Sequence, residues 1–189
     1  ENILGTSNVA LAHKYGVKPI GTFAHEMPMT YAGIADANAE NIRESHNEML
    51  SDWYDQYGND LSIALTDTFG SDFFFEDFTK EQAENWRGLR QDSGDPYDFG
   101  EKAINFYLAK GIDPATKTIV FSDGLDIDEI VKLHEYFKEK VNVVFGWGTT
   151  LTNDLGLKAL NIVMKATHVE LPNGKEADLV KLSDDEGKH

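Results

Sequence analysis

The chain has 189 residues, enough for one domain with a hydrophobic core, and its 33 acidic and 17 basic residues give a formal charge of −16. This charge argues against binding to nucleic acid or to an anionic membrane surface, because both need clustered Lys and Arg. Because it has no cysteine, the chain has no disulfide, no thiolate nucleophile and no cysteine-based zinc site. No apolar run approaches the roughly 18 residues that span a bilayer, and no signal peptide is visible, so we expect a cytoplasmic protein.

Helical and extended patterns alternate along most of the chain. They predict helices over 6–15, 37–57, 79–86, 96–110 and 126–140, and strands over 17–23, 61–66, 118–121 and 141–145. A further short apolar segment ends in the polar run 87–96. Residues 160–171 and 177–182 flank a Pro-Asn-Gly turn and predict an antiparallel hairpin. The aromatic cluster of Phe73, Phe74, Phe75, Phe78 and Trp86 indicates burial or a partner interface.

Strands that alternate with helices imply a largely parallel sheet with right-handed crossovers. Polar residues follow five successive predicted strands, at 25–26, 67, 90–95, 122–124 and 146–150. Contributions from so many strands to one edge favour a (β/α) barrel over a doubly wound sheet. Five or six strands fall short of the eight that a complete barrel holds in about 250 residues. We therefore expect residues 1–189 to form a single α/β barrel-type domain that is part of a larger barrel.

The run 87–96 reads Arg-Gly-Leu-Arg-Gln-Asp-Ser-Gly-Asp-Pro. Its charged groups beside a flexible glycine suit a phosphorylated sugar and its metal, since ligands bind at the carboxyl ends of strands in α/β proteins. Pro96 suits the first turn of the following helix. The alternative is an ordinary strand-to-helix turn in which Ser and Asp serve as helix caps.

Gly146-Trp147-Gly148-Thr149-Thr150 follows an apolar strand and is a candidate phosphate loop. Glycines let the backbone approach an anion closely, and the N-terminus of a helix behind the loop would add unpaired N–H groups. The alternative is a tight turn that needs glycine for conformational reasons only.

Ser122-Asp123-Gly124 and Asp67 are less specific signals. Asp123 could bind ribose hydroxyls or a metal, or cap the helix that follows. Asp67 could contact a base, a ribose hydroxyl or a metal-bound water, or make a structural hydrogen bond.

His25, with Glu26 beside it, is the best candidate for a nucleophile or an acid–base group among the six histidines. A nearby carboxylate can orient a histidine, fix its tautomer and raise its basicity. A structural role is the alternative. The histidine spacing contains no His-x-x-x-His or comparable pair and does not support a zinc site.

The ordered motifs resemble the nicotinate phosphoribosyltransferase family over essentially the whole chain. The resemblance is carried by the segments 5–8, 21–26, 65–68, 88–96, 120–123, 145–154 and 180–184. It implies a type II phosphoribosyltransferase, which has an irregular α/β barrel and active sites shared in a homodimer. It also implies transfer of the phosphoribosyl group of 5-phosphoribosyl 1-diphosphate to nicotinate in NAD salvage, with ATP hydrolysed and Mg²⁺ bound mainly through substrate phosphates.

The resemblance also implies roles for individual residues. By motif, His25 resembles the histidine that ATP phosphorylates, with Glu26 as its neighbour, and Asp67 resembles an acid near the ribose. Further residues resemble substrate-binding positions: Arg90, Asp92, Ser93 and Asp95, the ribose-contacting turn Ser122, Asp123 and Gly124, and the phosphate loop Gly146, Gly148 and Thr149.

The chain departs from the family pattern in length, because family members are roughly twice as long. The resemblance therefore implies that residues 1–189 are a C-terminal fragment lacking the N-terminal half. The Gly-Thr-Arg-Arg segment and the aromatic residue that stacks on nicotinate are absent; Gly5-Thr6 is followed by Ser7-Asn8. Two other functions stay open: a nicotinamide phosphoribosyltransferase-like enzyme, against which Asp95 argues, and a non-catalytic fragment that binds phosphorylated ligands.

Overall fold

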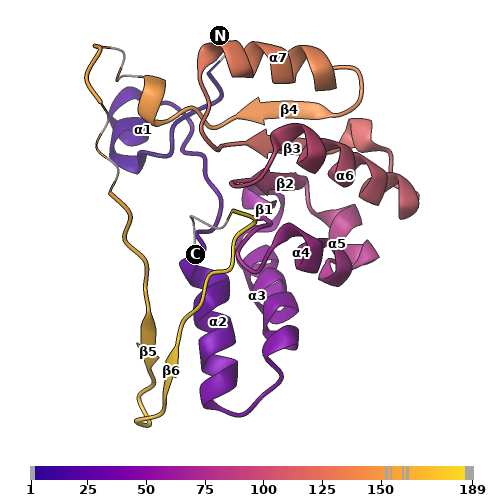
Figure 1. The fold of residues 1–189 in the computed structure, drawn as a ribbon. Helices are drawn as coiled ribbons and strands as arrows, with labels where there is room; N and C mark the ends of the chain where they lie inside the picture. Colours follow the sequence, from indigo (N-terminus) through magenta and orange to yellow (C-terminus); the bar gives the residue numbers. More distant parts are fainter. Residues whose placement is uncertain (1–2, 152, 154, 159, 161, 186–189) are drawn as a thin grey trace.

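A computed structural model describes residues 3–151, 153, 155–158, 160 and 162–185. Its core is a parallel sheet of four strands in the order β1-β2-β3-β4, and a separate antiparallel pair, β5-β6, follows near the end of the chain (Figure 1). The strands are β1 Ile63–Leu65, β2 Gly88–Gln91, β3 Thr118–Phe121, β4 Asn142–Phe145, β5 His168–Glu170 and β6 Glu176–Asp178.

The helices begin and end at local sequence signals. Thr79 and Gln82 form a reciprocal capping box before α5, and Asp126 accepts a hydrogen bond from the Glu129 N–H before α7. The α-helices are α1 Val9–Tyr15, α2 Glu26–Ala37, α3 Ile42–Tyr57, α4 Ser71–Asp77, α5 Lys80–Asn85, α6 Pro96–Ala109 and α7 Ile127–Phe137. Short 3-10 turns lie at Gly58–Leu61, Pro114–Thr116 and Thr149–Leu151.

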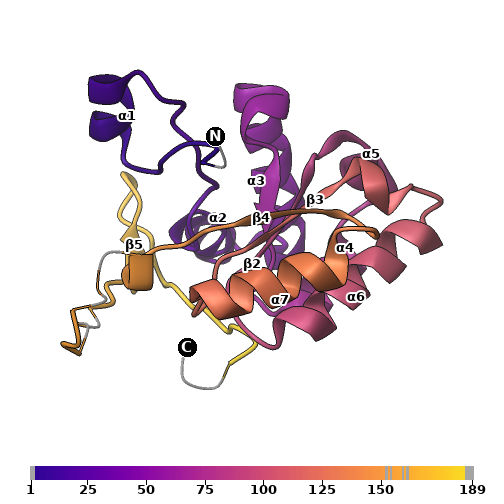
Figure 2. The same cartoon turned by 90° about the horizontal axis from the view of Figure 1, so that it is seen from above.

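Each strand of the sheet pairs in parallel with the next one along the chain, through register pairs such as Leu65 with Arg90 and Arg90 with Val120. Helices α6 and α7 form the crossovers after β2 and β3 and lie side by side (Figure 2). This sequential order is the arrangement found in (β/α) barrels. The α/β class, the parallel sheet and the C-terminal antiparallel pair are as predicted. In the described residues the sheet is open.

The hydrophobic core lies between the sheet and its helices. Leu89, Ile119 and Phe121 of the sheet are fully buried, and Phe121 stacks on Phe137 of α7 with ring centroids 5.4 Å apart. The predicted aromatic cluster belongs to this core: Phe74, Phe78 and Trp86 are buried. Its role as a buried structural cluster is therefore confirmed.

The strand predicted over 17–23 is wrong. This segment makes a single parallel bridge, between Thr6 and Pro19, and belongs to no sheet in the part of the chain described. Pro19 has no N–H to donate to a ladder. Phe23 instead anchors the segment, since its buried ring packs edge-on against Trp53 and Trp86.

The helix predicted over 37–57 is α3, which begins later, at Ile42, and the preceding helix α2 was not predicted. Ala39 takes a left-handed conformation at φ 57° and separates the two helices. Asn41 then accepts a hydrogen bond from the Arg43 N–H and starts α3. The sequence signal for α2 is weak because Pro28 lies near its start, where proline is still tolerated.

The predicted hairpin exists, but its strands are shorter than 160–171 and 177–182, and residue 161 lies outside the described residues. The pair packs against α2, as Figure 1 shows. Gly33 permits the contact: a Cβ there would lie 2.4 Å from Cδ2 of Leu179 and 3.1 Å from Cγ1 of Val169. From this anchor the chain returns as residues 179–185 to the carboxyl edge of the sheet.

Candidate active site at the carboxyl edge of the sheet

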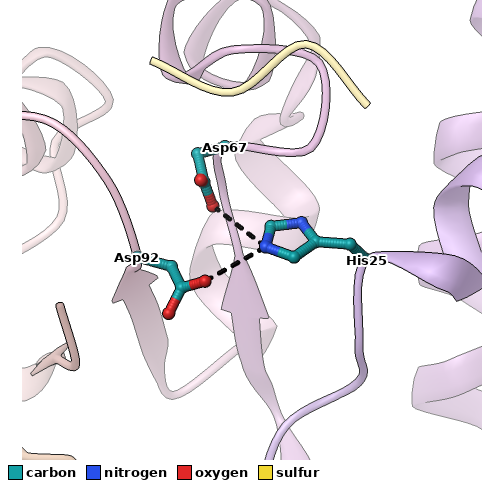
Figure 3. A group of neighbouring side chains, drawn as sticks. All are labelled: His25, Asp67 and Asp92. Carbon is teal, nitrogen blue, oxygen red and sulfur yellow. Dashed lines mark hydrogen bonds and ion pairs between the residues drawn. The ribbon is translucent and has the colours of Figure 1, made fainter. Parts of the chain in front are cut away.

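His25 lies immediately before α2, and its ring reaches the carboxyl ends of β1 and β2. Its Nε2 lies 3.1 Å from Oδ2 of Asp92 and 3.9 Å from Oδ1 of Asp67, as Figure 3 shows. Its Nδ1 lies 2.9 Å from Oγ1 of Thr68. The prediction that His25 follows a strand was wrong, but the structure brings it to the expected edge.

These contacts define the tautomer of a neutral His25 ring. The Asp92 carboxylate can only accept, so Nε2 carries the proton and donates it. Nδ1 is then the acceptor, and the Thr68 hydroxyl donates to it. The lone pair of the ring therefore lies on Nδ1, while Nε2 faces two carboxylates.

Asp67 follows β1 and is only 1% exposed. Its Oδ2 accepts a hydrogen bond from Oγ of Ser93 (2.6 Å) and lies 3.8 Å from Nζ of Lys181. Its Oδ1 has no hydrogen-bond partner in the described residues and is the oxygen that faces His25. A buried carboxylate with one open oxygen is a feature of a site and is costly in a core.

Arg90, in β2, connects three segments of the site. Its guanidinium donates to Oγ of Ser122 after β3 (2.8 Å), to Oγ1 of Thr22 (2.9 Å) and to Oδ1 of Asp92 (2.7 Å). Ser122 also lies 3.0 Å from Oδ1 of Asp92. Three donors in a rigid fork thus tie the ends of β2 and β3 to the segment before α2.

The Asp92 carboxyl is held in its ionised form. Burial alone would raise its pKa, but the hydrogen bond from His25, the charge and hydrogen bond of Arg90, and the Ser122 hydroxyl outweigh burial. Together they hold the pKa of Asp92 well below its usual range. The site therefore keeps a fixed negative charge beside His25 at neutral pH.

Ser93 and Asp95 were both predicted as substrate contacts, and the two residues lie in different surroundings in the structure. Ser93 is buried and holds Asp67. Asp95 is exposed and caps α6, because its Oδ1 accepts hydrogen bonds from the N–H groups of Tyr97 and Asp98. The alternative interpretation of Asp95 as a helix cap describes its geometry. Glu26 begins α2, and its carboxylate makes no hydrogen bond or ion pair with another described side chain.

The turn after β3 contributes one residue to the network. Ser122 contacts Arg90 and Asp92, whereas Asp123 and Gly124 form the bend that follows, with Gly124 at φ 59°. Asp123 does not cap α7; Asp126 does. Its predicted role as a ribose contact stays a prediction.

The candidate phosphate loop is open. Gly148 and Thr149 are exposed, and the loop continues into a 3-10 turn of three residues, Thr149–Leu151. Gly146 alone touches the network: a Cβ there would lie 2.9 Å from Cβ of Ser122. The loop therefore meets the site at Ser122.

His25, Asp67 and Asp92 each offer one ligand atom, and these atoms lie within 4.8 Å of one another. Two carboxylates at this spacing fit a divalent cation such as Mg²⁺, and the open Oδ1 of Asp67 is the best-placed ligand.

Sequence reasoning did not select Thr22, Thr68 and Lys181 as site residues, although all three lie inside motifs quoted for the resemblance. Each reaches the site through a contact that is distant in sequence, such as the 43 residues between His25 and Thr68. No local pattern marks a threonine or a lysine for such a contact. The sequence marked these residues only by placing them inside the segments that carry the family resemblance.

The fold and the site define an α/β protein with a charged site at the carboxyl edge of a parallel sheet, built around a histidine held between a hydroxyl and two carboxylates. The model of the nicotinate phosphoribosyltransferase (NAPRTase) family matches residues 1–188. The chain belongs to this family, and the resemblance seen in the sequence is confirmed.

Similar proteins agree with this assignment. The chain is 45% identical over 187 residues to a nicotinate phosphoribosyltransferase of Photorhabdus laumondii, covering 98% of this chain and 44% of that protein. A Xanthomonas campestris nicotinate phosphoribosyltransferase is 44% identical over 188 residues, with coverage of 100% and 45%. A crystal structure of the Porphyromonas gingivalis enzyme superposes with a TM-score of 0.90 at 38% identity, covering 98% of this chain and 47% of that one.

The chain thus spans less than half the length of the relatives it matches. Within the described residues, no helix is both long and apolar enough to cross a membrane.

Proposed function

We propose that a full-length protein containing this chain is a nicotinate phosphoribosyltransferase. It would convert nicotinate, 5-phosphoribosyl 1-diphosphate and ATP into nicotinate mononucleotide, diphosphate, ADP and phosphate. The observation that carries the proposal is the His25 ring, whose Nδ1 contacts a neutral hydroxyl while Nε2 faces Asp92 and Asp67.

In this proposal, His25 is the phosphorylated residue and Nδ1 is its nucleophilic atom. The Nδ1 lone pair attacks the γ-phosphorus of ATP after the Thr68 hydroxyl moves aside, and the bond to ADP breaks. The ring then carries positive charge, and Nε2–H keeps its proton because Asp92 and Asp67 stabilise it. Asp67 and Asp92 are the carboxylates that would hold Mg²⁺ beside the substrate phosphates, where a bound ion would neutralise phosphate oxygens.

Transfer to nicotinate then needs the ribose to be positioned. Displacement at the anomeric carbon passes through an oxocarbenium-like state, with the ring nitrogen of nicotinate forming the new bond as diphosphate leaves. Arg90, Ser122 and Asp123 are proposed to hold the phosphoribosyl substrate, and Gly146, Gly148 and Thr149 its 5-phosphate. Ser93 is proposed to act on the substrate through Asp67, to which its buried hydroxyl donates. The energy of phosphorylation is coupled to substrate affinity.

We also propose for the full-length protein the barrel, the compartment and the dimer that the family resemblance implies. The open sheet would be a sector of the irregular barrel, completed by the part of the protein that the chain does not span. The enzyme would act in the cytoplasm as a homodimer with shared sites, which sedimentation and mixing of two inactive variants would test.

The direct test is incubation of the full-length protein with radioactive γ-labelled ATP. We expect an acid-labile label that is lost in His25→Ala and kept in the control His134→Ala, since His134 lies exposed on α7. Phosphorus NMR should identify the Nδ1 isomer. Label retained in His25→Ala would contradict the proposal, and so would an absence of nicotinate mononucleotide alongside tight binding of the phosphoribosyl substrate. Comparing turnover of nicotinate and nicotinamide tests the choice of base.

A further inference from the structure

Gln91, the last residue of β2, is buried, and the proposed chemistry assigns it no task. Only 2% of the residue is exposed. Its side chain lies on the opposite face of the strand from that of Arg90, because successive side chains of a strand alternate. A glutamine amide in such a place carries two donor hydrogens and an acceptor oxygen, and each of them needs a partner.

The amide nitrogen of Gln91 reaches past the end of the strand to the turn that follows. Nε2 donates to the carbonyl oxygens of Ser93 (3.0 Å) and Gly94 (3.1 Å). Both partners lie within three residues of Gln91, so the side chain closes a tight loop around Asp92. The segment 92–94, here called the 92–94 turn, leads from β2 toward α6.

The other half of the Gln91 amide has no partner. Its Oε1 is buried and accepts no hydrogen bond within the described residues. An unpaired buried oxygen costs stability, and a methionine of similar length would avoid that cost. What the amide nitrogen holds, and not the stability of the core, therefore explains a glutamine at this position.

The 92–94 turn carries two groups of the candidate site. Oδ2 of Asp92 lies 3.1 Å from Nε2 of His25, as Figure 3 shows, and the Ser93 hydroxyl donates to Oδ2 of Asp67 (2.6 Å). Two successive residues thus direct their side chains to different groups, which requires one fixed backbone conformation. The turn closes at Gly94 with φ 74°, a left-handed conformation that glycine adopts without strain.

We propose that Gln91 is a positioning residue for the His25 reaction. By holding the carbonyls of Ser93 and Gly94, its amide fixes the turn and with it the direction in which Asp92 faces the histidine. A fixed Asp92 keeps the ring in the orientation that leaves Nδ1 available to the phosphoryl group. The proposal rests on the proposed function of His25, but its geometric part, that the amide holds the turn, is independent of that function.

The first measurement is single-turnover labelling of the full-length protein with γ-labelled ATP, because it separates rate from folded fraction. A purely structural role would lower the final amount of label, whereas a positioning role lowers the rate constant. We expect Gln91→Met to reach the final label of the parent with a rate constant about 10-fold lower, since a full 1 Å displacement of a positioned group costs on the order of 10²-fold.

The matched control is Gln82→Met, the same substitution outside the site. Nε2 of Gln82 donates to Oδ1 of Asn47 (2.8 Å), and its Oε1 accepts from the Thr79 N–H (2.8 Å), so this variant also loses two hydrogen bonds. Both halves of the Gln82 amide have partners, whereas Gln91→Met removes an unpaired oxygen. We therefore expect Gln82→Met to lower the melting temperature more than Gln91→Met does and to leave the labelling rate constant unchanged.

A second variant reaches the same turn through the backbone and keeps the test decisive if Gln91→Met folds poorly. Gly94→Ala places a Cβ on a residue with φ 74° and strains the turn, so it should also slow labelling. Gly111→Ala is its control, because Gly111 has φ 75° just after α6 and no atom within 4 Å of an added Cβ. The double variant Gln91→Met/Gly94→Ala should be slowed by less than the product of the single effects, because both changes loosen one turn.

Three labelling results would overturn the proposal: a parent-like rate constant in Gln91→Met or in Gly94→Ala, an equal slowing in Gln82→Met, or single effects that multiply fully in the double variant. Hydrogen exchange of the Gly94 N–H, followed by NMR, tests the geometric part without ATP. We expect this exchange to be faster in Gln91→Met than in the parent, and equal exchange would also overturn the proposal. If the parent takes no label, the phosphohistidine role fails on its own, and the exchange comparison still decides whether Gln91 holds the turn.

Discussion

The two edges of the parallel sheet both carry polar and charged side chains, but these side chains have different partners. At the amino edge they donate to backbone carbonyls. Lys117 donates to the carbonyls of Glu84 (2.7 Å) and Trp86 (2.8 Å), and Arg87 donates to that of Asn59 (3.2 Å). At the carboxyl edge Arg90 donates instead to side chains on three segments.

This difference separates structural polar groups from those of the candidate site. Carbonyl oxygens at the amino edge need donors once they are buried, so a lysine there completes the hydrogen bonding of the fold. At the carboxyl edge the side chains pair with one another and leave Oδ1 of Asp67 without a hydrogen bond within the described residues. We infer that side-chain networks with an open buried oxygen mark a site more reliably than charge itself does.

The strongest test of the difference between the two edges replaces two arginines by alanine: Arg87, just before β2, and Arg90, in β2. Arg90→Ala removes donors to Ser122, Thr22 and Asp92, so we expect nicotinate mononucleotide formation to fall on the order of 10²-fold, the scale for misplaced positioning groups. Arg87→Ala removes one exposed hydrogen bond to a carbonyl and should change the rate less than about 2-fold, since exposed sites contribute little. Steady-state rates of both variants check this. Equal losses would remove the distinction between the edges.

The amino edge should respond in stability and not in chemistry. Lys117→Met leaves the carbonyls of Glu84 and Trp86 without their donor. We expect the free energy of unfolding to fall by about 3 kcal/mol or more, because each of the two hydrogen bonds from the charged group contributes about 1.5–3 kcal/mol. Activity per folded molecule should stay unchanged. Urea unfolding measures the first quantity, and Lys132→Met on the surface of α7 is the control.

Most of the core of the fold could be predicted from the sequence. The strand over 118–121 was predicted with its observed bounds, and the caps of α5 and α6 follow local rules that need only a few neighbouring residues. The α2 helix was not predicted, and the segment around Pro19 was predicted as a strand although it makes only an isolated bridge. Both errors have one cause: a proline near a helix start and a proline in an extended segment leave similar local patterns. The position of the segment around Pro19 is set by the packing of Phe23 against Trp53 and Trp86, which no local pattern reveals.

The candidate site could be predicted only in part, and for a related reason. Parallel strands bring their carboxyl ends together, so Asp67, Arg90, Asp92 and Ser122 were expected to meet. Asp95 was predicted as a substrate contact and caps α6, because the same residue type also caps helices; its contact with the substrate stays a prediction. Thr68 was missed because its contact with His25 spans 43 residues of sequence, and Lys181 was missed because Asp67 lies still further away along the chain.

The charge of Asp92 gives a pH test of the carboxyl edge. The pKa of Asp92 is lowered in the folded state from its ordinary value of 3.8, so its contribution to stability is present above about pH 4 and is lost as the pH falls through the folded pKa. Asp92→Asn should therefore be less stable at neutral pH and should lose less stability on acidification than the parent. Urea unfolding at neutral pH and near pH 3 compares them. The exposed Asp98→Asn is the control, and parallel curves for parent and Asp92→Asn would contradict the expectation.

The smallest expected effect concerns the point where the phosphate loop meets the network. Gly146→Ala places a Cβ 2.9 Å from Cβ of Ser122, so Ser122 or the loop has to shift by a few tenths of an ångström. Ser122 contacts both Arg90 and Asp92, and we expect the KM for the phosphoribosyl substrate to rise by less than about 10-fold, because a full 1 Å displacement costs on the order of 10²-fold. Gly148→Ala meets no atom within 4 Å and is the matched control. If Gly148→Ala has the larger effect, the open end of the loop, and not its junction with Ser122, governs binding.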